Sequence, residues 1–286
     1  MDHPLGSEWI DVQGLINKHG LQPNKKLGQN FLIDPQYLNQ VADAGEIVDQ
    51  DTVLEIGAGI GNLTRLLGAK ARHVIAVEID ANLIPILSEF TRGYSNIEVI
   101  HGDILALEIS DLITSSPFQV IANIPYYITS KIIRYLMTGS IKPQRIILTI
   151  QNEVAERICA LSGKQSLLSL GVQVFGRPTI ESKIPAGAFF PIPKVDSAIV
   201  RIDMFPSPLI PAEYLETFFY LAKAGFGQKR KNLRNSLSAG TTLDKKSCEQ
   251  LLQSTGIDYR RRSETLSIAE WQTLTLEYQR ITFPQE

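Results

Sequence analysis

Short apolar runs that alternate with amphipathic stretches from Thr52 onward constrain the fold of this chain more than any other feature. Five of these runs predict strands: VLEIG, VIAVEI, IEVI, VIAN and RIILTI. Strands separated by helical patterns are typical of a parallel sheet flanked by helices. Later runs near residues 168–175 and 195–204 predict further strands. We therefore expect a seven-stranded α/β sheet with its last strands antiparallel.

Helical patterns flank this sheet in the sequence. Asp34 suits an N-cap and Pro35 a first helical turn, which predicts a helix to about Ala44. Residues 154–161 predict another helix. Residues 205–211, FPSPLIP, contain three prolines and no helical or strand period, which indicates a domain boundary. Apolar spacing beyond it predicts helices, so we expect an α/β domain over residues 1–205 and a small helical domain over residues 206–286.

Composition excludes several classes of protein. The 286 residues are 44% hydrophobic and 20% charged, which is enough apolar material for a globular core. Two cysteines are too few for a disulfide framework and are not spaced like metal ligands, so we predict no metal site. Residues 1–13 lack the pattern of a secretory leader, and no run approaches the ~18 apolar residues of a membrane span. We expect a cytoplasmic protein with no membrane partner.

Charge is unevenly distributed along the chain, although the net charge is only −2. Residues 223–286 hold 11 basic and 7 acidic side chains, whereas residues 1–222 hold 17 and 23. Five cations occur without an acid in residues 223–234: Lys223, Lys229, Arg230, Lys231 and Arg234. Such a cluster can neutralise phosphates. A solvated helical face would show the same charge pattern.

A glycine-rich turn follows the first predicted strand in LEIGAGIG, at Gly57, Gly59 and Gly61. Glycines let a backbone approach a ligand closely, although a bare structural turn would look similar. Glu78 lies 21 residues after Gly57, where a carboxylate can accept both hydroxyls of a ribose, or could precede the next helix as an N-cap acid. Asp103, in HGDI after the third strand, suits the exocyclic amine of adenine, although alone it is more typical of a loop acid.

Together these three strand ends predict a nucleoside site at the carboxyl edge of a doubly wound sheet. A dinucleotide fingerprint would have glycine at the sixth position of G-x-G-x-x-G, where this chain has Asn62. Because that glycine pattern serves to hold a pyrophosphate, its absence favours S-adenosylmethionine over NAD.

The fourth strand ends in Asn123-Ile124-Pro125-Tyr126, which suits methyl transfer to an amine of a base. Such an amine is a poor nucleophile because its lone pair is delocalised. The Asn123 side-chain oxygen and the Ile124 carbonyl could each accept one N–H as charge develops. Pro125 would stiffen the loop, and Tyr126 would offer a ring on which the base stacks. A turn with a buried tyrosine is the structural alternative.

The chain resembles the ribosomal RNA adenine N6,N6-dimethyltransferases, the KsgA family. The motifs that carry this resemblance are KKLGQNFLID at 25–34, EIGAGIGNLT at 55–64, VEID at 77–80, HGDIL at 101–105, NIPYYIT at 123–129, FFPIPKVDSAIV at 189–200 and FGQKRKNLRNSL at 226–237. The resemblance implies a Rossmann-like methyltransferase domain followed by a small helical domain. It also implies S-adenosylmethionine-dependent dimethylation of N6 in two adjacent adenosines near the 3′ end of small-subunit rRNA.

The resemblance further implies roles for single residues. Contacts with the cofactor would fall on Asn30, Leu32, Gly57, Glu78, Asp103 and Asn123. Tyr126 would stack on one face of the target base and Phe189 on the other. We also expect Gly59 at the cofactor, and Gln29 and Asn30 to close over it as part of a lid, although residues 25–32 could instead be a disordered leader.

The expected partner is small-subunit rRNA in a pre-ribosomal 30S particle, bound by a monomer through the cations of a helix over residues 226–237. Two alternatives stay open: a large-subunit rRNA adenine methyltransferase, and a non-catalytic ribosome-assembly or nucleic-acid-binding factor on the same fold. The segment FPIPKVDSAIV and the basic C-terminal region favour the small-subunit group. The presence of Glu78, Asp103, Asn123 and Tyr126 argues against a purely non-catalytic protein.

Overall fold

The computed structural model describes residues 11–114 and 117–283. The chain divides into two compact units, the first comprising Met1–Ala155 and Pro178–Met204 and the second Glu156–Arg177 and Phe205–Glu286. The second of the two stretches in this unit begins at Phe205. This residue lies in the proline-rich segment 205–211, where the sequence predicts a domain boundary. The unit also takes in residues 156–177, which the sequence placed in the α/β domain, because α8 (Leu167–Gln173) packs on α9 (Leu215–Phe226).

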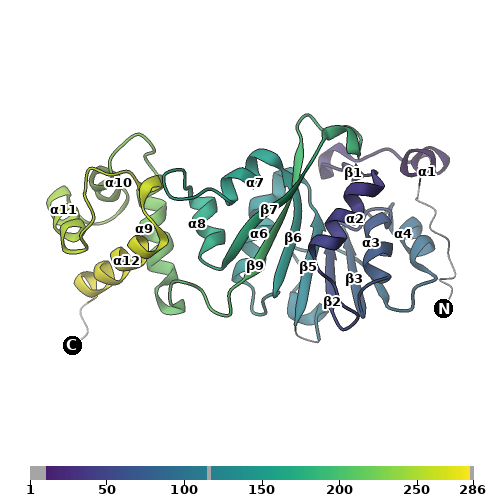
Figure 1. The fold of residues 1–286 in the computed structure, drawn as a ribbon, viewed down its shortest axis with the longest axis horizontal. Helices are drawn as coiled ribbons and strands as arrows, with labels where there is room; N and C mark the ends of the chain where they lie inside the picture. The colour runs from purple at the N-terminus through teal and green to yellow at the C-terminus, as the bar shows by residue number, and fades with distance from the viewer. Residues whose placement is uncertain (1–10, 115–116, 284–286) are drawn as a thin grey trace. The chain divides into compact units, whose positions relative to one another are not determined.

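The first unit is built on a seven-stranded sheet in the order β4-β3-β2-β5-β6-β9-β7 (Figure 1). The expected α/β fold is confirmed, and so is the expected number of strands in its sheet. β2 pairs in parallel with β3 and β5, whereas β6 pairs with β9 in the antiparallel direction. The strands have the following bounds: β2 Thr52–Ile56, β3 His73–Glu78, β4 Ile97–His101, β5 Phe118–Asn123, β6 Arg145–Gln151, β7 Gly176–Ile184 and β9 Ser197–Met204.

One predicted strand is wrong. The apolar run near residues 168–175 forms helix α8, Leu167–Gln173, and the seventh strand is β7 instead. Ser166 and Ser169 make a reciprocal capping box at the start of α8, which satisfies backbone donors that a strand would place in a ladder. A short apolar run does not by itself distinguish a buried helix from a strand.

Helices α2, α3 and α4 lie on one face of the sheet (Figure 1). As predicted, α2 starts at Pro35 after the N-cap Asp34, whose side chain accepts a hydrogen bond from the Gln36 amide. The core beneath includes Leu38 of α2 and Val53 of β2, both at most 2% exposed. The helices and short elements of this unit are α1 Val12–Lys18, η1 Lys25–Leu27, β1 Phe31–Leu32, α2 Pro35–Ala44, α3 Asn62–Gly68, α4 Ile84–Thr91, α5 Ile109–Leu112, η2 Tyr126–Ile128, α6 Thr129–Thr138, η3 Ala186–Ala188 and β8 Phe189–Phe190, and α7 Asn152–Ile158 crosses into the second unit.

The strand order changes direction between β2 and β5. From β2 the chain moves outward through β3 to β4, and then returns to the other side of β2 at β5 and moves on to β6. Right-handed crossovers therefore place α3 and α4 on one face and α6 on the opposite face. The connections diverge at this point, which opens a crevice at the carboxyl ends of β2 and β5.

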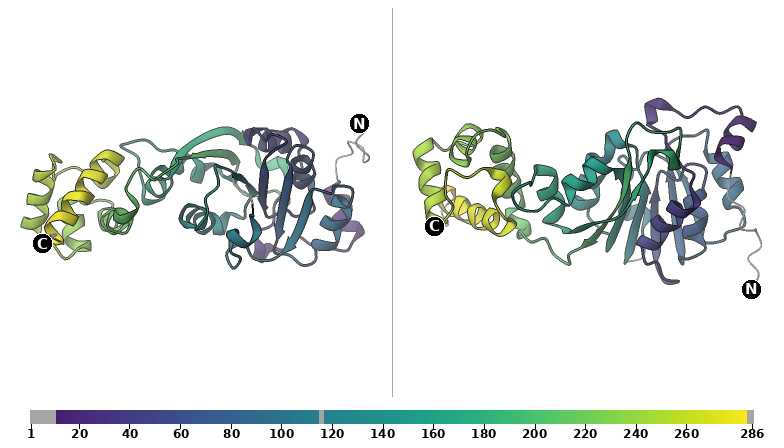
Figure 2. Two further views of the ribbon diagram at one scale, coloured as in Figure 1. Left: turned by 90° about the horizontal axis from the view of Figure 1, so that it is seen from below. Right: turned by 45° about the horizontal axis from the view of Figure 1, so that its top comes forward.

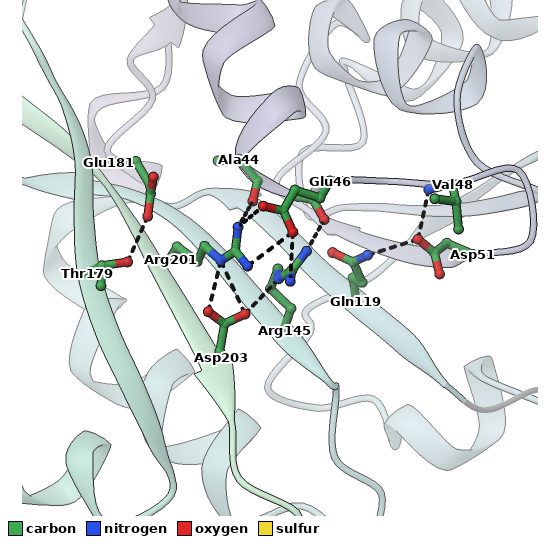
Figure 3. A network of polar contacts seen from close by, with 11 residues as sticks. Ala44, Glu46, Val48, Asp51, Gln119, Arg145, Thr179, Glu181, Arg201 and Asp203 are labelled. Carbon is green, nitrogen blue, oxygen red and sulfur yellow. Dashed lines mark hydrogen bonds and ion pairs between the residues drawn. The ribbon is translucent and has the colours of Figure 1, made fainter.

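A network of ion pairs fixes the loop that joins α2 to β2 (Figure 3). The Glu46 carboxylate of this loop forms ion pairs with Arg201 and Arg145, with N–O distances of 2.7 Å and 3.1 Å. Both arginines also bind Asp203 on β9, at 2.9 Å and 2.8 Å. The guanidinium of Arg145 donates a further bond to the Gly45 carbonyl, at 2.6 Å. These contacts attach the end of α2 to β6 and β9.

The second unit is helical (Figure 2). Its core includes Phe218 and Trp271, whose rings meet edge to face at 6.4 Å. Besides α8, its elements are η4 Ala212–Tyr214, α9 Leu215–Phe226, α10 Leu233–Gly240, α11 Lys245–Ser254, η5 Ser263–Thr265 and α12 Ile268–Thr282. The prediction of one basic helix over residues 226–237 is wrong, because α9 ends at Phe226 and α10 begins at Leu233, with Asn232 as its N-cap.

Within residues 11–114 and 117–283, no helix is long and apolar enough to cross a membrane. The expectation about a leader concerns residues 1–13, of which residues 1–10 lie outside the described part of the chain.

Candidate active site

One pocket at the crevice of the first unit brings together most of the predicted site residues. Its walls are the ends of β2, β3 and β5, the loop after β4 and the loop that precedes β1. The predicted residues that line it are Gln29, Asn30, Gly57, Gly59, Glu78, Asp103, Asn123, Ile124, Pro125 and Tyr126. Motifs up to 97 residues apart in the sequence thus form a single site.

The glycine turn after β2 has a backbone that only glycine adopts readily. Gly57 and Gly59 have φ angles of +78° and +61°. A Cβ atom on Gly59 would also lie 3.2 Å from the Phe31 ring. The Gly59 amide donates to Glu78 Oε2 at 2.7 Å, so the turn is attached to the end of β3. The turn therefore offers a close, rigid backbone surface to a ligand.

Glu78 is a fixed acceptor at the end of β3. It is 5% exposed, and its second oxygen accepts a hydrogen bond from the Asp80 amide at 2.8 Å. Burial raises the pKa of Glu78, and its backbone hydrogen bonds oppose that rise. Each carboxylate oxygen has more than one lone-pair site, so both can accept a further hydroxyl proton. The geometry suits the two hydroxyls of a ribose.

Asp103 lies next along the same edge of the sheet. His101 pairs with Glu78 in the β3–β4 ladder, and Asp103 follows it by two residues. One carboxylate oxygen accepts a bond from the Leu105 amide at 3.0 Å, which orients the exposed side chain in its loop. An adenine amine next to a ribose held by Glu78 would meet an acceptor here.

Asn123, at the end of β5, faces the same pocket. Its side-chain nitrogen donates to the Asn30 carbonyl at 3.2 Å. That bond leaves the amide oxygen as the acceptor available to a substrate amine. Pro125, with φ −58° and ψ 134°, continues the loop in an extended form that leads away from the strand.

Tyr126 is held by a residue that the sequence did not single out. Its hydroxyl lies 2.7 Å from Ser197 Oγ, and Ser197 is fully buried at the start of β9. Ser197 belongs to the segment FFPIPKVDSAIV, but only tertiary structure relates it to Tyr126. The hydrogen bond fixes one edge of the half-buried ring.

Gln29 fastens the expected lid. Its side-chain oxygen accepts from the Asn24 amide at 2.7 Å, and its nitrogen donates to Asp80 Oδ2 at 2.8 Å. The first bond closes the loop before β1 on itself, and the second attaches this loop to the segment that follows β3. Asp80 was not identified from the sequence as a partner of this loop.

Phe189 lies elsewhere than the resemblance implied. It is 1% exposed, belongs to the core with Leu38 and Ile121, and does not line the pocket. The reason is strand alternation: β8 pairs with β1 so that Phe189 is opposite Leu32, and both side chains turn into the core. We therefore correct the expectation that Phe189 stacks on a base. Leu32, an expected cofactor contact, does not line this pocket either. It lines a small cavity next to the glycine turn.

The predicted RNA-binding cations differ in environment. Lys223 is exposed at the end of α9, and Lys229, Arg230 and Lys231 are exposed in the turn between α9 and α10. Arg234 is half-buried, pairs with Glu249 at 2.7 Å and lies 5.0 Å from the centre of the Tyr259 ring. Arg234 therefore has structural partners within its own unit.

Comparison with known proteins gives consistent results. A sequence model of the family described as ribosomal RNA adenine dimethylase matches residues 20–278. "Ribosomal RNA small subunit methyltransferase A" of Dehalococcoides mccartyi is 42% identical over 265 residues, which covers 92% of this chain and 91% of that protein. The protein of the same name from Alkaliphilus metalliredigens is 40% identical over 273 residues, covering 93% and 95%.

Two solved structures are similar over most of their length. A dimethyladenosine transferase from Plasmodium falciparum has a TM-score of 0.75 and 28% identity, and covers 86% of this chain and 96% of its own. The 23S rRNA methyltransferase ErmE has a TM-score of 0.70 and 29% identity, covering 86% and 98%. The fold is thus similar to that of a dimethyladenosine transferase and to that of a 23S rRNA methyltransferase.

Proposed function

Because this chain belongs to the ribosomal RNA adenine dimethylase family, we propose that it dimethylates N6 of two adjacent adenosines near the 3′ end of small-subunit rRNA. Family membership, the Rossmann-like methyltransferase fold and the use of S-adenosylmethionine agree with the expectations from the sequence. Names of the curated relatives favour the small subunit over the large one.

The arrangement around Asn123 is the observation that carries the proposed chemistry. The side-chain nitrogen of Asn123 donates its hydrogen bond to the Asn30 carbonyl. The side-chain oxygen of Asn123 can therefore accept one N–H of an adenine amine. The carbonyl of the buried Ile124 follows directly and can accept the second. Two such acceptors hydrogen-bond to the N–H groups as the nitrogen becomes tetrahedral, and so stabilise the positive charge that develops there. S-adenosylmethionine, when bound, supplies the methyl group.

Tyr126 would hold the plane of the target base. Its hydroxyl is fixed by Ser197, so its ring enters the pocket in a defined orientation. Stacking of a base on an aromatic ring contributes ~1 to 3 kcal/mol. A base must leave its stack to reach Asn123, so a single-stranded loop or an opened end is the suitable substrate.

We place the RNA contacts on Lys223, Lys229, Arg230 and Lys231 of the second unit. These four side chains are exposed, whereas Arg234 already pairs with Glu249. In this proposal the chain acts as a monomer in the cytoplasm, on small-subunit rRNA in a pre-ribosomal 30S particle.

The test is to incubate the protein with labelled S-adenosylmethionine and undermethylated small or large ribosomal subunits. We expect label on N6 of two adjacent adenosines in the small subunit. Label in the large subunit would instead support the large-subunit alternative. Binding to small subunits without methyl transfer would support an assembly factor.

Asn123→Ala tests the chemistry. Removing one acceptor of the transition state should slow single-turnover methyl transfer roughly 10²-fold, while RNA affinity stays nearly unchanged. The assay is run at saturating S-adenosylmethionine, because Asn123 also lines the cofactor pocket. Rates within a few-fold of wild type would contradict the proposed role of the amide oxygen.

A further inference from the structure

Tyr127 is an exposed aromatic residue at the mouth of the candidate active site, and the chemistry above does not use it. It follows Tyr126 directly and lines the same pocket, but it is 61% exposed whereas Tyr126 is half-buried. Among the residues that the structure describes, the Tyr127 ring contacts no other aromatic ring and its hydroxyl makes no hydrogen bond. A single exposed aromatic is ordinary, so its surroundings must decide what it does.

The Tyr127 ring is oriented by the loop that precedes β1. A Cβ atom on Gly28 of this loop would lie 3.2 Å from the ring and 3.3 Å from the Pro125 Cβ. Gly28 has a φ angle of +62°, which glycine adopts readily. The loop backbone can therefore approach the ring and Pro125 closely. This packing restrains the ring and leaves most of its surface open for a flat ligand.

Helix α6 extends the exposed surface away from the pocket. The short helix η2, which contains Tyr127, runs directly into α6. Ile132 and Leu136 are among the residues that α6 buries, whereas Lys131 and Arg134 are exposed. These two cations follow Tyr127 by four and seven residues, which is the spacing of one helix face. An aromatic ring and two cations thus follow one another along α6.

The two cations have no counter-charge within the described part of the chain. Neither Lys131 nor Arg134 forms an ion pair there, and α6 itself contains no acidic residue. Proteins that bind single-stranded nucleic acid combine aromatic side chains, on which bases stack, with cations that follow the phosphates. The face formed by Tyr127, Lys131 and Arg134 has both parts, and it begins where a target base would enter the pocket.

We propose that Tyr127 stacks on the nucleotide next to the target adenosine, and that Lys131 and Arg134 bind phosphates of the same strand. The inference rests on the function proposed above and adds an RNA contact in the first unit. The Cα atoms of consecutive residues are about 3.8 Å apart, so the rings of Tyr126 and Tyr127 can meet consecutive bases. For one of two adjacent target adenosines, this neighbouring nucleotide is the other adenosine.

The first test compares Tyr127→Leu with Tyr127→Phe in single-turnover methyl transfer to undermethylated small subunits, at saturating S-adenosylmethionine. We expect Tyr127→Leu to raise the half-saturating subunit concentration roughly 10-fold with little change in the maximal rate. Stacking on the neighbouring base contributes equally to binding the substrate and the transition state. Tyr127→Phe should stay within twofold of wild type, because it keeps the ring. Equal behaviour of the two variants would overturn the proposal.

A control is needed because Tyr127 also contacts the loop before β1. Leucine keeps an apolar side chain next to Gly28, so we expect Tyr127→Leu to bind S-adenosylhomocysteine within twofold of wild type by calorimetry. A loss of cofactor affinity as large as the loss of RNA affinity would assign Tyr127 to holding this loop, and would overturn the stacking role.

The second test measures binding without methyl transfer. The probe is a short single-stranded uridine RNA with one central adenosine, titrated by fluorescence anisotropy in the presence of S-adenosylhomocysteine. An abasic nucleotide on one side of the adenosine should weaken binding roughly 10-fold in the wild type and less than twofold in Tyr127→Leu. Equal losses in both proteins would overturn the stacking contact, and so would failure of the wild type to bind this RNA.

The same titration tests the cations. Replacing Lys131 and Arg134 with glutamine should flatten the dependence of log affinity on log salt by up to ~0.7 per lost contact with a single strand. Arg92→Gln, at the exposed end of α4, is the matched control and should leave the slope unchanged. An unchanged slope in the double variant would make this face a solvated one and overturn the phosphate contacts.

Failure of this inference can be distinguished from failure of the proposed function. If the wild type methylates small subunits but Tyr127→Leu matches it in every assay, only the stacking contact is wrong. If label instead enters large subunits, the proposed function is wrong, and the titration with the uridine RNA still tests the contacts along α6.

Discussion

The Tyr126 hydroxyl fixes the orientation of a ring that takes part in the proposed reaction. The ring belongs to the loop after β5, but its hydroxyl is held by Ser197 at the start of β9, at 2.7 Å. Ser197 is fully buried, so it does not touch a substrate in this arrangement. In the proposed function, Ser197 is therefore a positioning residue for the Tyr126 ring on which the adenine would stack.

Ser197→Ala should therefore lower the rate of methyl transfer. A neutral hydrogen bond contributes about 1 kcal/mol, so we expect a decrease of roughly fivefold in kcat with little change in cofactor affinity. Tyr126→Phe removes the same bond from the other side and keeps the ring.

The double variant should be no slower than either single variant if both act through this bond. Single-turnover kinetics on the four proteins provide the measurement. Additive losses would mean that Ser197 and Tyr126 act independently.

Among elements, the link between α2, β6 and β9 depends on charge. The hydrogen bond from Arg201 lowers the pKa of Glu46, and Arg145 contributes in the same direction. Burial raises the pKa of Asp203, but hydrogen bonds from Arg201 and Arg145 outweigh it, so the net direction is downward. Figure 3 shows both arginines between the two carboxylates.

Stability should therefore decrease in acid. A carboxylate whose pKa is lowered by folding stabilises the protein above its unfolded pKa, and this contribution disappears as the pH falls through the folded pKa. In the unfolded chain, the pKa values are 4.5 for Glu46 and 3.8 for Asp203. The unfolding temperature should therefore decrease when the pH is lowered below about 4.5. Arg201→Gln should flatten this decrease, whereas the exposed Lys131→Gln should not. Equal slopes in both variants would contradict the role of the network.

Replacing cations in the turn between α9 and α10 should change RNA binding. Replacing the cation Arg234 in α10 should change stability. Replacing Lys229, Arg230 and Lys231 with glutamine should flatten the dependence of log RNA affinity on log salt by up to ~0.7 to 0.9 per lost contact. Arg234→Gln should instead lower the unfolding temperature, because it removes the pairing with Glu249. An unchanged salt slope in the triple variant would show that RNA binds elsewhere.

At the scale of the whole molecule, the proposed cofactor site and the proposed RNA contacts of the basic turn belong to different units. All residues that line the pocket at the ends of β2, β3 and β5 come from the first unit, whereas the basic turn belongs to the second. The two kinds of binding should therefore respond to separate sets of variants.

Glu78→Gln should weaken S-adenosylhomocysteine binding roughly 10- to 150-fold, as expected for hydrogen bonds to a charged acceptor. Its RNA affinity and salt slope should match those of the wild type. Conversely, the triple variant of the basic turn should keep the affinity for S-adenosylhomocysteine. Calorimetry and RNA titration on both proteins test this separation, and a loss of both kinds of binding in either variant would count against it.

The sequence by itself determined the features whose chemistry is local. Gly57 directly follows β2, Glu78 ends β3 and Asn123 ends β5, each within a short sequence motif. The carboxyl ends of parallel strands meet at one edge of a sheet, so strand ends that are distant in sequence form one site. The N-cap at Asp34 was equally predictable, because its partner is the Gln36 amide, two residues away.

Only the tertiary structure decided the features that depend on pairing between distant segments. Tyr126 and Ser197 are 71 residues apart, and no local pattern links them. The register of β1 with β8 turns Phe189 into the core, since side chains on a strand alternate between its faces. Arg234 looked like its neighbours in a basic run, but the fold supplies Glu249 as its partner. A sequence reports the charge and polarity of each side chain, whereas folding determines what that side chain meets.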